Sequence, residues 1–274
     1  MNPLWRMAVA VREAPRAMWG LAKALVTQSM AYRADYLIGF GMSLLPSLML
    51  TFVWWSIHGA RSGSERLALL AYFLAVALVD QVTDSDNFQW QLAGRIRGGQ
   101  VELEALMGAP LGIVWFGTAV GMRAGQIIAK APGLVLLIAA LFVAGAWVRV
   151  SPEHLGYAIL ALCGAFVVRF LLSVAVSALS FWIDDVAGVY FTVQLAASVL
   201  SGRLIPLHLL GAEVESVLAL TPFYYLTFAP ATLLAGSNPA HPVLLGQLLW
   251  GGVLLVVAWM LTRSGLRRYT NVAA

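Results

Sequence analysis

LGYAILALCGAFVVRFLLSVAVSALSFW, residues 155–182, is an apolar run that carries a single charge, Arg169. A helix needs about 20 apolar residues to cross the roughly 30 Å hydrocarbon layer of a membrane. Inside that layer each backbone amide must find its hydrogen-bond partner within its own segment, so this run is predicted to be a transmembrane helix. The stretch therefore indicates an all-α integral membrane protein.

The composition of the whole chain favours the same class. The chain has 274 residues, of which 61% are hydrophobic and 11% charged, whereas roughly 25% of residues are charged in an average soluble domain. Its net charge is +4, but the basic residues surround apolar runs instead of sharing one polar face, which disfavours nucleic acid as a partner. No metal site or cofactor is expected in this chain, because the single Cys163 and the scattered histidines lack ligand spacing.

Five further apolar runs are long enough, or nearly so, to cross a membrane. Six transmembrane helices are therefore predicted, at 36–57, 67–87, 125–147, 155–182, 186–206 and 243–262. They make residues 1–274 a single transmembrane domain. The second run is the least regular, because it meets acidic residues near its end, Asp80, Asp84 and Asp86.

The positions of Lys and Arg predict the orientation, because cytoplasmic loops carry the excess of positive charge. With both termini in the cytoplasm, that side receives Arg6, Arg12, Arg16, Lys23, Arg33, Arg95, Arg97, Arg123, Lys130, Arg263, Arg267 and Arg268. The opposite side receives Arg61, Arg66, Arg149 and Arg203. This bias is consistent with six spans and cytoplasmic N- and C-termini.

Residues 15–33 precede the first span. Pro15 stands at the expected helix start, and Met18, Leu21 and Leu25 share one face. This spacing favours a helix that lies in the membrane interface with its apolar face toward lipid. A plain extension of the first span is the alternative.

The segment RIRGGQVELEALMGAP, residues 95–110, is charged and contains two adjacent glycines. After the glycines, Leu103, Leu106 and Met107 share one helical face, with Glu102 beside it. A short amphipathic helix is predicted here, on the cytoplasmic side. Its apolar ridge suits a groove of a soluble partner, while a helix resting on the membrane surface is the alternative.

Residues 207–237 form a long segment on the outer side. It is too apolar for a free loop and is interrupted by prolines at 222 and 230, so it does not suit a single crossing helix. It is predicted to fold back as re-entrant short helices that pack on the bundle or cap a pathway. Its aromatic residues Phe223, Tyr224 and Tyr225 either face a substrate or belong to an interfacial aromatic belt.

Arg169 lies near the middle of its span, where a charge costs roughly 2.5–3.5 kcal/mol on insertion scales. It must therefore face protein or water. Either it contacts a substrate or gates a pathway, or it pairs with an acid such as Asp80 or Asp84, which share a helical face. An ion-coupled secondary transporter would use these three residues as a relay, although no internal repeat of the kind common in such proteins is visible. A purely structural membrane protein also stays open.

Several short motifs follow one another in a fixed order. They are Ile96, Arg97 and Gly99 in a loop running to Leu106 and Pro110, then SGRLIPL at 201–207, TPF at 221–223, Pro230 and Gly236. Together with an N-terminal interfacial helix and six spans, this order resembles the membrane subunit of type-2 ATP-binding-cassette (ABC) transporters. The resemblance covers nearly the whole chain and is closest to a six-span permease subfamily of bacteria.

The resemblance implies that ATP and Mg are bound by a separate nucleotide-binding subunit, which acts as a dimer. Neither Lys23 nor Lys130 follows a glycine, so the chain has no GxxxxGK phosphate-binding loop. The segment 95–110 would contact the ATPase subunit. The implied contact residues are Arg95, Arg97, Gly99, Glu102, Leu103, Leu106, Met107 and Pro110.

The resemblance also implies transport by alternating access in the bacterial inner membrane, together with a second permease copy or a related permease. Because type-2 permeases are mostly exporters, the expected cargo is an amphipathic or lipid-like molecule. The candidate substrate-pathway or gating residues are Arg169, Asp80, Asp84, Pro206, Phe223, Tyr224 and Tyr225.

Overall fold

The structure, a computed structural model, describes residues 23–24, 26–58, 63–101, 104, 110–144, 152–235 and 240–272. Within these ranges every regular element is helical, which confirms the all-α fold. The long helices are α2 (Arg33–His58), α3 (Gly63–Thr83), α4 (Asp86–Arg97), α6 (Leu111–Ala129), α7 (Ala131–Val143), α8 (Pro152–Ala178), α9 (Ala187–Leu200) and α12 (Ala240–Val272). The short helices are η1 (Leu179–Phe181), η2 (Leu207–Leu209), α10 (Ala212–Leu218), η3 (Phe223–Tyr225) and α11 (Phe228–Leu234).

Five helices in the described part of the chain are long and apolar enough to cross a membrane: Arg33–Ile57, Gly63–Arg97, Leu111–Ala129, Leu155–Phe181 and Ala240–Arg268. A sixth crossing results if the pair Ala212–Leu218 and Phe223–Leu234, bent by 95°, is one broken span. This bent pair belongs to the segment predicted to fold back as re-entrant helices. The architecture is thus that of a multi-pass membrane protein.

Two of the predicted spans have different bounds in the structure. Instead of a helix at 125–147, α6 covers Leu111–Ala129 and α7 starts after Lys130. The stretch before residue 125 looked too polar to cross because it contains Arg123, but that side chain is buried inside the bundle. In place of 186–206, α9 has 14 residues and is about 21 Å long, which is short of the hydrocarbon thickness.

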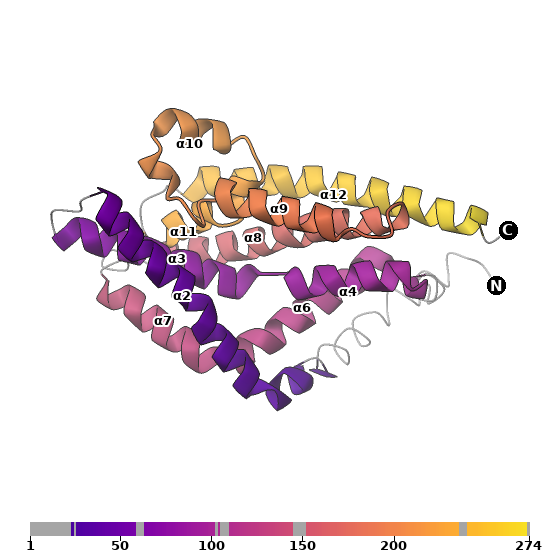
Figure 1. Cartoon of the computed structure of the whole chain (residues 1–274), viewed down its shortest axis with the longest axis horizontal. Helices are drawn as coiled ribbons and strands as arrows, with labels where there is room; N and C mark the ends of the chain where they lie inside the picture. Colours follow the sequence, from indigo (N-terminus) through magenta and orange to yellow (C-terminus); the bar gives the residue numbers. More distant parts are fainter. Residues whose placement is uncertain are drawn as a thin grey trace.

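The second span is longer than predicted, because α3 continues into α4 (Figure 1). Only Asp84 and Ser85 separate the two helices: Asp84 N donates to Asp80 O over 3.1 Å and continues α3, while Gln89 N donates to Ser85 O over 3.0 Å in the first turn of α4. The helices lie in line and act as one rod, the α3–α4 rod. This rod joins the acidic residues of the interior to the start of the 95–110 segment.

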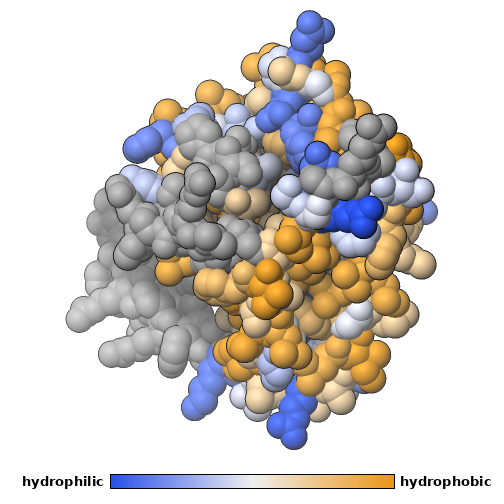
Figure 2. Space-filling model, turned by 90° about the vertical axis from the view of Figure 1, so that its left-hand side faces the viewer, coloured by the Kyte–Doolittle hydropathy of each residue, from blue (hydrophilic) through white to orange (hydrophobic). Residues whose placement is uncertain are grey.

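The helices pack around two hydrophobic clusters. One is centred on α3, α7 and α11 and contains Phe73, Leu141 and Leu233. The other is centred on α4, α6, α8 and α12 and contains Leu92 and Trp115. Large apolar side chains also lie exposed along α2 and α12, and Figure 2 shows hydrophobic groups over much of the face at the α2–α3 end. Such an apolar surface is expected of a protein surrounded by lipid.

About half of the N-terminal segment 15–33 lies outside the described residues. Where it is described, residues 26–30 are helical, and Thr27 Oγ1 donates to Lys23 O over 2.9 Å. An interfacial helix therefore stays a prediction.

Candidate functional site

Asp80 of α3 pairs with two arginines inside the bundle. Its Oδ1 lies 3.1 Å from Nη2 of Arg169 on α8, and its Oδ2 lies 2.9 Å from Nε of Arg203, which follows α9. The side chains of Asp80 and Arg169 are 14% and 13% exposed, whereas that of Arg203 is 44% exposed. Of the two acids that the sequence offered to Arg169, the structure thus selects Asp80.

The same arginine reaches the bent segment between α9 and α12. Nη2 of Arg169 also donates to Thr227 Oγ1 over 3.0 Å and to Leu226 O over 3.4 Å. These hydrogen bonds tie α8 to α3 and to the start of α11. A charged side chain at this depth is tolerated because several partners share it.

A second ion pair lies one helical turn further along α3. Asp84 accepts from Arg123 of α6 over 3.1 Å, and Arg123 also donates to Gln81 O over 3.3 Å. Lys130, between α6 and α7, donates to the Gln81 side chain over 2.8 Å. The acids at 80 and 84 stand on one helical face, as predicted, but they bind different cations.

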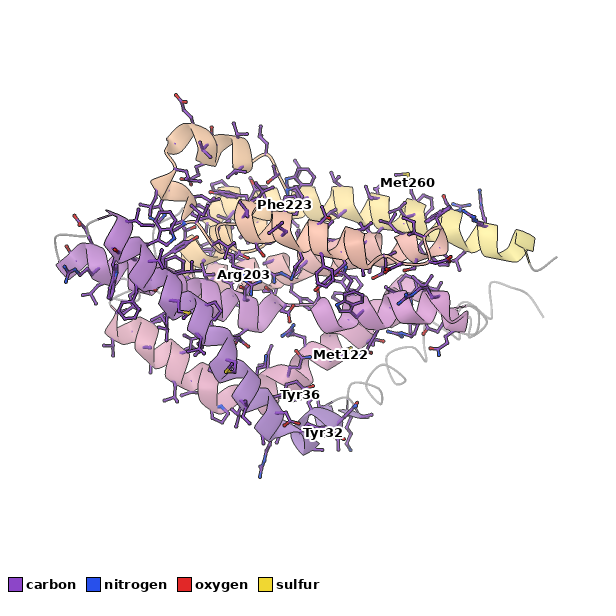
Figure 3. All side chains as sticks on the ribbon, in the orientation of Figure 1. Tyr32, Tyr36, Met122, Arg203, Phe223 and Met260 are labelled. Carbon is purple, nitrogen blue, oxygen red and sulfur yellow. The ribbon has the colours of Figure 1, made fainter. Side chains whose placement is uncertain are left out.

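The placement of Arg203 depends on the preceding glycine. Gly202 has a φ of +77°, a left-handed conformation that residues with a side chain adopt at a cost. A Cβ there would lie 2.7 Å from the Tyr72 hydroxyl oxygen, and this hydroxyl donates to Gly202 O over 2.6 Å. The tight turn directs Arg203 toward Asp80, and Figure 3 shows Arg203 beside the C-terminal half of α3.

The predicted ATPase-coupling segment is described at its two ends. Arg95 pairs with Glu104 over 3.0 Å, and Glu104 also accepts from Trp115 Nε1 over 2.8 Å. Arg97 donates to the carbonyl of Asp184 over 3.2 Å. The chain turns after α4 at Gly99, whose φ is +70°, and Pro110 precedes the first residue of α6. Glu102, Leu103, Leu106 and Met107 lie outside the described residues.

A groove of about 960 Å³ runs between α6, α8 and α12. Its walls are mainly apolar and include Phe116, Leu171 and Trp259. At one end, Arg263 lies 5.0 Å from the centre of the Trp259 ring. The groove is distinct from the ion pairs, which lie on the other side of α8.

Comparison with known proteins gives one match. The family model described as ABC-2 family transporter protein matches residues 40–273. The chain belongs to the ABC-2 transporter family. Searches of curated proteins and of solved structures found no match. The match spans every helix from within α2 onward, so the ion pairs and the groove are both parts of an ABC-2 membrane subunit.

The remaining candidate residues of this ABC-2 subunit contribute mainly to packing between helices. Pro206 is buried at the start of η2, and Phe223 packs against the second hydrophobic cluster. Tyr224 is buried and donates to Glu215 over 3.2 Å. Tyr225 lies against α12 at Gly246. The described contacts of these aromatic side chains thus involve the second hydrophobic cluster, Glu215 and α12.

Arg123, Lys130 and Arg203 were missed as partners of the acids, because they were counted only as signals of membrane orientation. The structure gives each of them a bond to a side chain of α3 or to Asp84 directly after it. One signal was available in the sequence: two acids on one face of α3 need more cationic partners than Arg169 alone. In an ABC-2 subunit, buried acids therefore indicate that neighbouring helices carry arginine or lysine side chains that pair with them.

Proposed function

We propose that this ABC-2 subunit is the membrane-spanning permease of an exporter for an amphipathic or lipid-like molecule in the bacterial inner membrane. A separate ATPase dimer binds ATP and Mg and supplies the energy. A second permease copy, or a related permease, completes the translocation pathway. The family supports the coarse assignment, and the α3–α4 rod is the observation that carries the finer one.

The rod gives a mechanical link between the ATPase and the interior. It holds Asp80 and Asp84 in the bundle and ends at Arg97, within the proposed coupling segment. A force on residues 95–110 is transmitted along the rod to the ion pairs with α6 and α8. Alternating access then consists of a change between two packed arrangements of these helices.

The charge distribution supports placing this end of the molecule in the cytoplasm. α4 and α12 both finish at the end where the C-terminus lies (Figure 1). The last turn of α4 carries Arg95 and Arg97, and the C-terminal part of α12 carries Arg263, Arg267 and Arg268. The positive-inside rule assigns such an end to the cytoplasmic side, where the ATPase subunit is located.

The experiment is to replace two residues of the predicted amphipathic ridge in the full complex, as Leu103→Asp together with Leu106→Asp. A charged ridge no longer fits an apolar groove, so transport is expected to fall at least about tenfold per ATP hydrolysed, equivalent to about 1.4 kcal/mol of coupling. Membrane insertion is expected to stay unchanged. Both quantities are measured in proteoliposomes with the co-purified ATPase subunit.

The matched control is Leu210→Asp with Leu220→Asp, two exposed leucines near α10. It introduces the same charge outside the proposed contact and should leave coupling intact. Wild-type coupling in the Leu103→Asp, Leu106→Asp variant would refute the assignment. Transport driven by a proton gradient without ATP, and lost in Asp80→Asn, would favour the ion-coupled alternative that uses Asp80, Asp84 and Arg169.

A further inference from the structure

A small pocket lies beside the Asp80 cluster, between α8 and α9. Both Arg169 and Arg203 line it, and hydroxyl groups of Ser198 and Thr227 are among its polar neighbours. Its volume is about 30 Å³, which accommodates about two water-sized groups. No carboxylate is present among the described residues that line it. The wall of the pocket is therefore cationic and rich in hydrogen-bond donors.

The charges at this place do not cancel. Arg169 and Arg203 contribute two positive charges, and Asp80, which pairs with both, contributes one negative charge. The net charge of the three groups is +1. Arg203 is 44% exposed, so its charge is partly screened by solvent, but the net positive charge of the three groups still attracts a group that brings one negative charge.

Donor groups are available for such an anion. Nη2 of Arg169 is used by Asp80 and Thr227, but its Nε is buried and makes no hydrogen bond. Arg203 contacts Asp80 through Nε, which leaves its two terminal nitrogens. Guanidinium groups bind the oxygens of carboxylates and phosphates with good geometry and charge-assisted hydrogen bonds.

The helix that lines the pocket also carries an exposed apolar surface. Phe191, Leu195 and Val199 of α9 are large exposed hydrophobic residues, on a helix face adjacent to the one that contributes Gln194 and Ser198 to the pocket. A ligand with an acidic head and a hydrocarbon tail can place the head between the arginines and the tail along α9. A small hydrophilic anion would gain only the first of these contacts.

We propose that this pocket binds the oxyanion head group, a carboxylate or phosphate, of an amphipathic ligand, and that the ligand is the transported molecule. The identification of the ligand as cargo rests on the proposed function, whereas the binding of the anionic head does not. Arg203 is the specificity-determining residue, because it supplies the positive charge in excess of the Asp80–Arg169 pair.

The test measures thermal unfolding of the full chain in dodecyl maltoside by tryptophan fluorescence, without ATP or partner. The probes are dodecyl phosphate and laurate, with dodecanol as the neutral amphiphile and inorganic phosphate as the free anion. Both anionic amphiphiles are expected to raise the unfolding temperature in a saturable manner. Dodecanol and inorganic phosphate are expected to have little effect at the same concentrations.

Two variants change the charge of the cluster in opposite directions. Arg203→Gln removes the excess charge and is expected to weaken dodecyl phosphate binding by at least about tenfold, because a charge-assisted contact is lost. Asp80→Asn removes one negative charge, which raises the net charge of the cluster to +2, and is expected to tighten binding and to make the fold more dependent on the anion. The matched control is Arg263→Gln, which removes an exposed arginine at the Trp259 ring and should leave binding unchanged.

The outcomes separate clearly. Equal weakening in Arg203→Gln and Arg263→Gln, or equal stabilisation by dodecanol, overturns the proposed site. If Arg203→Gln does not fold, Asp80→Asn decides: tighter binding supports the site, and unchanged or weaker binding overturns it. Saturation by inorganic phosphate as tight as by dodecyl phosphate overturns the role of the tail.

A second measurement tests the cargo assignment, with the ATPase subunit present in proteoliposomes. Dodecyl phosphate is expected to stimulate ATP hydrolysis in wild type and not in Arg203→Gln. Binding without stimulation overturns the identification of the ligand as cargo and keeps the anion site. Coupled transport without anion binding overturns the site and leaves the proposed function standing, so the two failures are distinguishable.

Discussion

The two sides of α8 present different environments to the rest of the protein. On one side, Arg169, Ser173 and Ser177 recur every four residues and contact α3 and α4: Ser173 shares a hydrogen bond of 2.7 Å with Ser85, and Ser177 donates to Gln89 O over 3.0 Å. On the other side, Leu160, Val167 and other apolar residues line the groove against α6 and α12. One helix thus separates a polar interior from an apolar crevice.

The two sides of α8 are stabilised in different ways. On the polar side, stability depends on each group having its partner, because an unpaired buried charge costs far more than a well-placed pair gains. On the α12 side, stability depends on shape, because close-packed side chains tolerate neither gaps nor added volume. Substitutions on the two sides should therefore destabilise the protein for different reasons. Different second substitutions should restore the lost stability.

The largest effect is expected from Asp84→Ala on the polar side. It leaves the buried Arg123 without its carboxylate, which should lower the free energy of unfolding by about 3–5 kcal/mol. Denaturation in detergent measures the change. Asp35→Ala, at an exposed acid of α2, is the control and should have little effect.

A double variant sharpens this prediction. Asp84→Leu with Arg123→Met replaces both charges by apolar side chains, which is often near neutral for buried pairs. It should recover most of the stability lost in Asp84→Ala. Failure to recover would mean that the ion pair does not account for the loss.

A smaller effect is expected from Gly246→Ala on the side of α12. The added Cβ would lie 2.2 Å from ring atoms of Tyr225, and overpacking of this kind costs about 1–3 kcal/mol. The control is Gly251→Ala on the same helix, where no atom lies within 4 Å of the added Cβ. Equal unfolding temperatures of the two variants would show that the Tyr225 ring moves aside at no energetic cost, which would contradict this prediction.

The smallest effect is expected from Glu104→Gln at the end of the α3–α4 rod. Glutamine keeps an oxygen for Trp115 Nε1 but loses the charge paired with Arg95. Because the neutral amide still offers an acceptor oxygen and only the charge is lost, the cost should be about 0.5–1.5 kcal/mol. Glu104→Ala also removes the acceptor of the buried Trp115 and should cost about 1–3 kcal/mol more. Thermal unfolding that ranks Gln below Ala in stability would contradict this account.

The sequence predicted the helical membrane fold because long apolar runs leave few alternatives in lipid. It also predicted that Arg169 faces protein or water and named Asp80 as one of two acids with which it could pair. The bounds of the helices were less predictable: the apolar run suggested a span at 125–147, whereas α6 begins at Leu111 and includes the buried Arg123. Its ion pair with Asp84 depends on two helices meeting, and such a contact between distant residues leaves no local pattern.

The contacts of Asp80 were even harder to predict from local sequence. Arg203 reaches Asp80 because Gly202 takes a left-handed turn and fits against Tyr72. The motif SGRLIPL pointed to a family by resemblance only, and nothing in its spacing pointed to residue 80. Local periodicity predicts elements, whereas the position of this turn follows from tertiary packing.

The α3–α4 rod has a consequence for how the protein sits in a bilayer. Its 35 residues measure about 52 Å at 1.5 Å per residue, against a hydrocarbon thickness of roughly 30 Å. Even at a steep tilt of about 40° the rod still spans about 40 Å along the bilayer normal, which is close to the full thickness with head groups. At any usual tilt, one end of the rod must therefore extend beyond the hydrocarbon layer. A change in bilayer thickness will change how far that end extends into the aqueous phase.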